Sequence, residues 1–268
     1  MQSVLYILFI TLAFQTWSCV TNSEGRRAYT IVPDSQMTSM GVQAYSEIIE
    51  DSRKKGTLVP RSSAAHEVVE RIGKRIAGAS GVDFKWEFVV INEPKTVNAF
   101  CLPGGKIAVY TGIFPVAKDE SSLAAIMGHE VAHATLRHGA ERMSQQLTLA
   151  GLSTAVNLSM SDSRHRDIAL GVFGMGAQFG IILPFSRGHE TEADSVGLRF
   201  AAKAGFNPYS AVGLWERMGA SGKSPFEFMS THPDPANRQK ALAAKQSEVM
   251  PLYNQSEKQV DKDLPKGV

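Results

Sequence analysis

The residues with the clearest chemical potential are His129, Glu130 and His133, which lie in the run His-Glu-Val-Ala-His. The stretch around them is apolar and free of proline, which predicts a helix over residues 124–139. Residues four apart lie on one helical face, so both imidazoles point the same way and can bind one zinc ion. Glu130 lies one position further round, where its carboxylate can take a proton from a water molecule at the metal.

A catalytic zinc site commonly has three protein ligands and one open position, so a third ligand is needed. The downstream candidates are imidazole and carboxylate side chains, namely His138, His189, Glu190, Glu192, Asp194 and His232. Glu190 and Asp194 share one helical face, whereas Glu192 points roughly 200° away from Glu190. Glu190 therefore suits the ligand role, and Asp194 can accept a hydrogen bond from the other ring nitrogen of a ligand histidine. A charged, solvated helix face is the alternative interpretation.

Several helices and a hairpin are expected to position these side chains. Apolar periodicity predicts helices over residues 36–51, 61–79, 186–204, 209–218 and 234–249. Strands are predicted over residues 84–91, 97–102 and 106–111, the last two forming a hairpin around Pro103-Gly104-Gly105. His138 is expected at the end of the zinc helix, near the negative pole of its dipole. The pattern predicts an α+β, predominantly helical fold with a small β-sheet or hairpin beside the zinc helix.

Two features allow more than one interpretation. The hairpin edge at Asn98, Ala99 and Phe100 can hold an extended substrate through main-chain hydrogen bonds, or it can be purely structural. The apolar segments 147–160 and 168–185 fit helices that are buried or cover the active site better than membrane spans. A single span would place the zinc ligands on opposite sides of a bilayer. Residues 147–185 are therefore also candidates for a plug over the cleft.

Composition and the N-terminus limit the class and the compartment. The 268 residues include 28 basic and 26 acidic side chains, without a basic run among aromatics, so no nucleic acid partner is expected. Two cysteines are too few for a disulfide framework.

The apolar run at residues 4–14 is typical of a secretory signal, and Cys19 after it resembles a bacterial lipidation site. An ordinary secretory signal and an uncleaved anchor are the alternatives. The expected divisions are a signal peptide at 1–18, a tether at 19–34, a single zinc metallopeptidase domain at 35–254 and a polar tail at 255–268.

Three ordered motifs carry a family resemblance. They are His-Glu-Val-Ala-His at 129–133, Ser-Arg-Gly-His-Glu-Thr-Glu-Ala-Asp at 186–194 and Ser-Thr-His-Pro-Asp-Pro-Ala-Asn-Arg at 230–238. Residues 97–238 resemble the gluzincin family of HtpX-type and CAAX-prenyl-protease-type zinc metallopeptidases, and within it the bacterial periplasmic members similar to BepA and LoiP. The resemblance implies a zincin-type catalytic domain with one zinc ion per chain.

The resemblance also implies a role for each motif residue. The implied zinc ligands are His129, His133 and Glu190. The implied catalytic glutamate is Glu130. Asp194 would support a ligand histidine. His232 would lie near the metal, either as an extra ligand in a resting site or as a donor to the reacting carbonyl. Arg238 would pair with a carboxylate of the site.

Together these features predict a zinc metalloendopeptidase that hydrolyses exported or misfolded proteins in envelope quality control. The expected partners are unfolded or misfolded polypeptides, a membrane contacted through a lipid anchor, and the outer-membrane protein assembly machinery. The expected location is the bacterial periplasm, at the outer membrane. The main alternative is a zinc-containing chaperone or assembly factor with little proteolysis, although a structural zinc site would not require Glu130. A membrane-embedded prenyl-protein protease would need several spans, and a hydrolase of other substrates has only the metal site in its favour.

Overall fold

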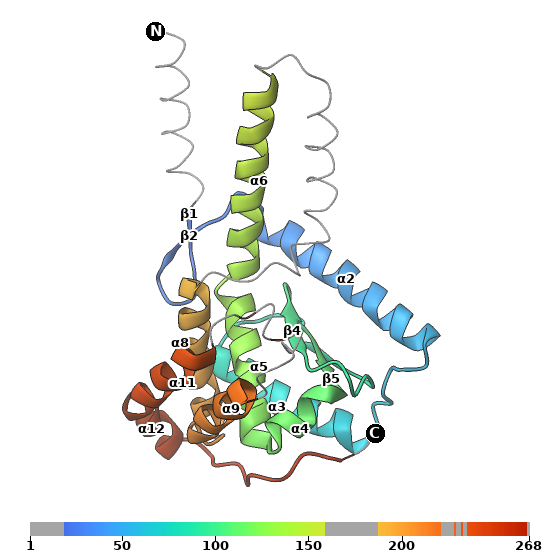
Figure 1. The fold of residues 1–268 in the computed structure, drawn as a ribbon, viewed down its shortest axis with the longest axis vertical. Coiled ribbons are helices and arrows are strands. Elements are labelled where there is room, and N and C mark those ends of the chain that lie inside the picture. Colours follow the sequence, from blue (N-terminus) through green and yellow to red (C-terminus); the bar gives the residue numbers. More distant parts are fainter. Residues whose placement is uncertain (1–18, 159–186, 221–227, 229–231, 233–234, 267–268) are drawn as a thin grey trace. The chain divides into compact units, whose positions relative to one another are not determined.

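The computed structural model describes residues 19–158, 187–220, 228, 232 and 235–266, which are coloured in Figure 1. The chain forms two compact units, one of residues 1–37 and 136–183 and the other of residues 38–135 and 184–268. The predicted single domain at 35–254 includes parts of both units. In chain order the elements are β1 (Cys19–Thr21), β2 (Arg27–Tyr29), α2 (Asp34–Lys54), α3 (Ala64–Ser80), β3 (Glu87–Ile91), β4 (Ala99–Leu102), β5 (Lys106–Tyr110), η1 (Thr111–Ile113), α4 (Phe114–Ala117), α5 (Glu120–Thr135), α6 (His138–Leu158), α8 (Arg187–Lys203), α9 (Tyr209–Ala220), α11 (Pro235–Ala244) and α12 (Gln246–Gln255).

Helix α5 carries the His-Glu-Val-Ala-His run and is buried along almost its whole length. The Asp119 carboxylate caps its first turn by accepting a hydrogen bond of 2.7 Å from the Ser122 N–H. The helix ends at Thr135 because Arg137 adopts a left-handed backbone conformation with φ of 64°. The predicted helix over 124–139 therefore ends early. His138 begins α6, so its expected place at a helix end is wrong.

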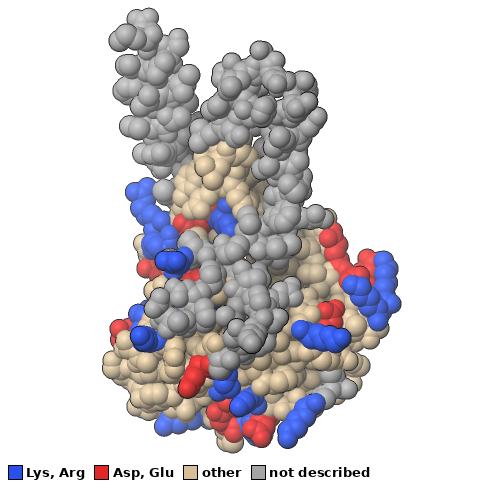
Figure 2. Space-filling model, viewed as in Figure 1, with Lys and Arg blue, Asp and Glu red and all other residues tan. Residues whose placement is uncertain are grey.

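A three-stranded sheet lies in the same unit as α5, with the order β3-β5-β4. The predicted hairpin is confirmed, because β4 and β5 pair antiparallel with Phe100 opposite Ala108. The parallel pairing of β3 with β5 was not predicted. Tyr45 of α2 packs on one face of the sheet. Figure 2 shows acidic and basic side chains intermixed over the face in view.

Helices α5 and α8 approach each other through two glycines. A Cβ atom on Gly128 would lie 2.6 Å from the Gly197 carbonyl oxygen, and one on Gly197 would lie 2.6 Å from the His129 nitrogen. Neither position accepts a side chain without separating the helices, since the opposing atoms belong to the backbone. The two helices that carry the metal-binding motifs are thus in backbone contact.

The C-terminal part differs from the prediction in two ways. The predicted helix at 234–249 is divided into α11 and α12 at Lys245. The polar tail after Gln255 was expected to fray, yet it follows the start of α5. Its main-chain hydrogen bonds are Gln259 N to Gly205 O at 2.8 Å, Glu120 N to Lys262 O at 3.0 Å and Leu264 N to Lys118 O at 2.8 Å. Leu264 is buried, so these contacts and apolar burial together fix the tail.

The other unit joins a small hairpin to α6. Strands β1 and β2 pair antiparallel, and the Glu141 carboxylate of α6 accepts hydrogen bonds from Arg26 Nη1 at 2.9 Å and Tyr29 N at 3.2 Å. The stretch expected as a tether at 19–34 therefore contains a hairpin.

The predicted signal peptide at 1–18 and the apolar segment at 168–185, with most of the predicted plug, lie outside the described residues. Within the described part of the chain, the helices lack the length and apolar character needed to cross a membrane.

Candidate metal centre

The structure brings the three predicted ligands together. His129 and His133 lie one turn apart on α5, and Glu190 lies in the first turn of α8. The distances are 3.0 Å between the two Nε2 atoms, 3.3 Å from His133 Nε2 to Glu190 Oε1 and 3.4 Å from His129 Nε2 to Glu190 Oε2. All three side chains are buried. Two imidazoles and one carboxylate therefore face a common point.

His232 contributes a fourth donor atom at this point. Its Nδ1 lies 3.2 Å from His129 Nε2 and 3.1 Å from Glu190 Oε1. The four side chains, His129, His133, Glu190 and His232, offer donor atoms that all lie within 4.8 Å of one another. A tetrahedral site with metal–nitrogen bonds of 2.0–2.1 Å requires donor separations of about 3.3–3.4 Å. The donor set and its spacing thus fit a small divalent metal ion.

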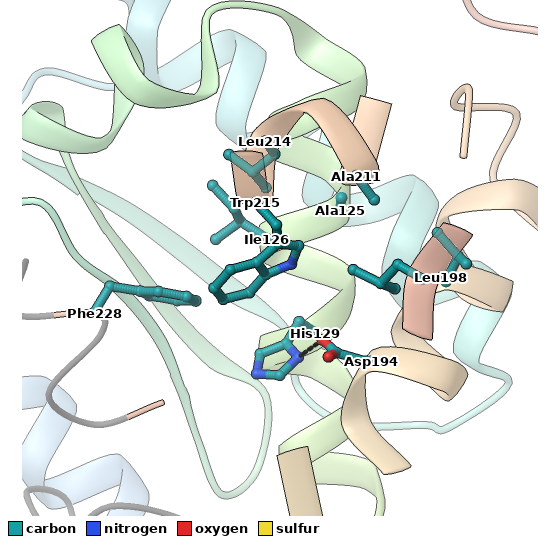
Figure 3. Close-up of a pocket in the computed structure, with 10 residues that line it drawn as sticks. Ala125, Ile126, His129, Asp194, Leu198, Ala211, Leu214, Trp215 and Phe228 are labelled. Carbon is teal, nitrogen blue, oxygen red and sulfur yellow. Dashed lines mark ion pairs between the residues drawn. The ribbon is translucent and has the colours of Figure 1, made fainter. Parts of the chain in front are cut away.

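Asp194 and Arg238 support the ligands from behind. Asp194 Oδ1 lies 3.0 Å from His129 Nδ1, the contact drawn as a dashed line in Figure 3. Arg238 donates from Nε to Asp194 Oδ2 at 2.7 Å and from Nη1 to Glu190 Oε2 at 2.8 Å. Burial raises the pKa of Asp194, but the Arg238 charge and the His129 hydrogen bond outweigh it and hold that pKa below its usual value. The carboxylate therefore stays charged and orients the His129 ring.

The Glu130 carboxylate is buried beside the ligands. Burial raises its pKa to about 8, although the neighbouring His129 opposes that shift. The Cys101 main-chain N–H donates a hydrogen bond to the carboxylate. Within the described residues Oε1 accepts no hydrogen bond, and it lies 3.4 Å from His232 Nε2. Glu130 thus keeps one oxygen available near the common point of the ligands.

His232 is held by Phe228, a residue that belongs to no recognised motif. The two rings stack with centroids 4.6 Å apart and planes at 27°, and the His232 N–H donates to the Phe228 carbonyl at 3.0 Å. Burial lowers the pKa of His232 to about 4, so the ring is neutral. Its Nδ1 faces Glu190 and its Nε2 faces Glu130. This position agrees with both roles expected for His232, a resting ligand and a donor to the substrate.

Strand β4 forms one edge of the sheet, as expected, but its outward-facing residues differ from the predicted set. Tyr110 N donates to Asn98 O at 3.0 Å, so Asn98 and, two residues on, Phe100 direct their main-chain groups to β5. Ala99 and Cys101 therefore direct theirs to the outer edge, where Ala99 N donates to Asn98 Oδ1 at 2.9 Å and Cys101 N donates to Glu130. Only Ala99 of the predicted three faces this edge with its main chain. Sequence reasoning missed Cys101. The alternation of main-chain direction along the hairpin register could have identified it.

This arrangement defines a metal-dependent peptidase of the zincin class. The chain belongs to peptidase family M48, whose sequence profile matches residues 63–246. The membership confirms the predicted enzyme class, metalloendopeptidase, and the predicted predominantly helical zincin-type fold.

Individual relatives include mitochondrial and bacterial proteins. The chain is 38% identical over 220 residues to the mitochondrial metalloendopeptidase OMA1 of Schizosaccharomyces pombe, covering 80% of this chain and 62% of the relative. It is 35% identical over 223 residues to the mitochondrial metalloendopeptidase OMA1 of Danio rerio, covering 77% and 45%. It is 29% identical over 199 residues to the β-barrel assembly-enhancing protease of Escherichia coli, covering 71% and 40%. The chain therefore spans less than two thirds of each of these relatives.

The comparisons correct the predicted location. Relatives at 38%, 37% and 35% identity carry mitochondrial names, so the prediction of a bacterial periplasmic lipoprotein at the outer membrane is wrong. That prediction relied on a short apolar run before Cys19, and such a run is shared by several kinds of targeting segment. The broad family resemblance is confirmed, and it extends to OMA1 proteins, which the motifs alone did not indicate.

Proposed function

We propose that this chain is a zinc-dependent endopeptidase that cleaves extended segments of unfolded or misfolded proteins. The observation that carries the proposal is the convergence of His129, His133 and Glu190 beside the available oxygen of Glu130. Zinc is the proposed ion because imidazole and carboxylate donors at these separations suit it. When bound, zinc supplies Lewis-acid chemistry, which lowers the pKa of water and polarises a carbonyl group.

Glu130 is the proposed general base. Its Oε1 takes a proton from water as the water oxygen forms a bond to the scissile carbonyl carbon, and the proton then passes to the amine nitrogen as the C–N bond breaks. The Cys101 N–H fixes the carboxylate, which favours one direction for Oε1.

His232 is proposed to have two positions. At rest its Nδ1 fills the fourth donor place, where it lies in the structure. With substrate bound, the ring would turn toward the reacting carbonyl oxygen and donate a hydrogen bond to it.

The free edge of β4 supports an extended substrate. The main-chain carbonyl groups of Ala99 and Cys101 face this edge, whereas their N–H groups donate to the Asn98 side chain and to Glu130. The edge therefore offers acceptors to a peptide and begins at the general base. A peptide paired along it would be held through its backbone, which tolerates many sequences. Such recognition favours unfolded segments over folded surfaces, and the proposed substrate class follows from it.

A second candidate function is assistance in protein assembly with little proteolysis. The name of the Escherichia coli relative, a β-barrel assembly-enhancing protease, favours it. Both functions would use the same edge of β4 to bind polypeptide. They differ in their need for Glu130.

The deciding experiment measures zinc content and casein cleavage for the purified chain, with and without a chelator. Glu130→Gln should keep zinc and lose at least about 10²-fold in cleavage rate, because its amide cannot accept the proton. Glu67→Gln, an exposed residue of α3, is the matched control and should cleave normally. Zinc-loaded Glu130→Gln that cleaves at the unaltered rate would refute the assignment. An unaltered chain that binds zinc and unfolded protein without cleavage would favour assembly.

A further inference from the structure

Trp215 of α9 is a buried aromatic residue beside the metal centre and belongs to none of the motifs. Its side chain is 4% exposed. The Arg238 guanidinium carbon lies 3.7 Å from the centre of the indole ring, in cation–π contact. Trp215, Phe228 and His129 line the same pocket, as Figure 3 shows. The indole thus contacts a residue that bonds to the metal-binding side chains.

Arg238 uses one planar group to hold two carboxylates. Its Nε and Nη2 donate to Asp194 at 2.7 Å and 2.5 Å, and its Nη1 donates to Glu190 at 2.8 Å. Because a guanidinium is flat, the direction of its plane determines where both carboxylates lie. The indole covers one face of that plane, so rotation of the guanidinium would lose the cation–π contact.

We propose that Trp215 is a positioning residue for the metal centre, which acts by fixing the guanidinium plane of Arg238. Through Arg238 it sets the carboxylate of Glu190, a proposed ligand, and that of Asp194, which orients His129. The inference rests on the proposed function because it assumes that this centre binds zinc.

A second contact places the indole behind His232 as well. The rings of Trp215 and Phe228 have centroids 6.1 Å apart at 42°, and Phe228 stacks on His232. The indole therefore contacts both Arg238 and the residue that holds His232. A phenyl ring at position 215 would keep an aromatic face but fill less of this space.

The test is zinc affinity, measured on the full chain by competition with a chromogenic chelator. Trp215→Leu should weaken zinc binding about tenfold, the lower end of the range for residues that orient metal ligands. Trp215→Phe should weaken it less, because phenyl retains a weaker cation–π contact. In an Arg238→Lys background, where the planar group is absent, Trp215→Leu should cause a much smaller further loss, limited to the part that passes through Phe228.

Trp86→Leu is the matched control, because Trp86 is partly buried in the loop before β3 and donates its indole N–H to Val82 O. Its zinc affinity should equal that of the unaltered chain. An unaltered chain without zinc affinity would overturn the proposed function together with the inference. Unchanged affinity in Trp215→Leu, or an equal loss with Lys at 238, would overturn the inference alone. If Trp215→Leu does not fold, the zinc affinity of Trp215→Phe, measured with Arg and with Lys at position 238, tests the inference in its place.

Discussion

Nδ1 of His129 lies 3.0 Å from Oδ1 of Asp194, on the side of the ring that faces away from His133. An N–H at Nδ1 that donates to this charged carboxylate leaves the lone pair on Nε2, the atom that faces Glu190. Asp194 and Arg238, whose Nη2 lies 3.0 Å from the same Nδ1, together fix the His129 ring so that Nε2 is available to a metal ion. Arg238 keeps that carboxylate charged and in place.

Asp194→Asn should weaken zinc binding by about 10- to 100-fold. The amide carries no charge and can present its NH₂ group to Nδ1, which would favour the wrong tautomer of His129. Chelator competition measures the change. Asp51→Asn, an exposed position on α2, is the control and should leave the affinity unchanged. Equal affinities for both variants would contradict the orienting role of Asp194.

His232→Ala should keep zinc bound, since His129, His133 and Glu190 remain, and should change the cleavage rate. A rate about 10²-fold lower would identify His232 as a donor to the carbonyl oxygen. A higher rate would identify it as a ligand that closes the resting site. Steady-state kinetics with an unfolded protein substrate distinguish the two. Kinetics identical to those of the unaltered chain would exclude His232 from the reaction.

Removal of residues 257–268 should destabilise the metal-free chain by about 2–4 kcal/mol. The deletion exposes the apolar area covered by Leu264 and removes the Asp261 carboxylate that accepts from the Ser121 N–H at 3.0 Å. Chemical denaturation in the presence of a chelator measures the loss. Removal of residues 265–268 alone is the control and should have little effect. A similar stability for both truncations would show that the tail does not hold α5.

Tyr45→Phe should make stability less sensitive to alkaline pH. The hydroxyl is buried without a hydrogen-bond partner among the described residues, and burial raises the pKa of Tyr45 well above its usual value. Above pH 10 the phenol loses its proton in the unfolded chain and keeps it in the folded chain, so stability falls as the pH rises above 10. Phenylalanine removes this loss. At neutral pH the variant should be equally stable or more stable by about 1 kcal/mol.

Urea denaturation at pH 7 and pH 10.5 tests this expectation. The unaltered chain should lose more stability between the two conditions than Tyr45→Phe does. A parallel loss in both proteins would show that another group, and not the Tyr45 phenol, carries the alkaline sensitivity.

The parts of the fold that local sequence determines were predicted. Helix α3 begins at Ser63, whose side chain accepts from His66 N, and ends at Gly81 with φ of 69°. Both are local signals of helix ends. The β4–β5 hairpin likewise follows from the turn between two short apolar runs. Glu190 as a ligand candidate followed from helical spacing alone, and the structure places it with the two histidines.

The features that depend on distant contacts were not predicted. Strand β3 pairs with β5 although β4 lies between them in the sequence, and no local pattern specifies that order. The end of α5 depends on a left-handed Arg137, a conformation that arginine rarely adopts and its sequence does not signal. Trp215 and Arg238 lie on different helices, and only the tertiary fold brings them into contact. The polar tail is fixed by main-chain hydrogen bonds, by burial of Leu264 and by the Asp261 carboxylate, and all of these depend on partners far away in the sequence.

The backbone contact between Gly128 and Gly197 fixes how closely the two ligand-bearing helices approach each other. Rotamer changes can shift a donor atom, but the separation of α5 and α8 is set by contact between main-chain atoms. A methyl group at either glycine would separate the helices and widen the space between the histidines and Glu190. Since selectivity among divalent ions depends on cavity size, such a variant would favour ions of larger radius. We therefore expect ion discrimination in this protein to depend partly on helix packing.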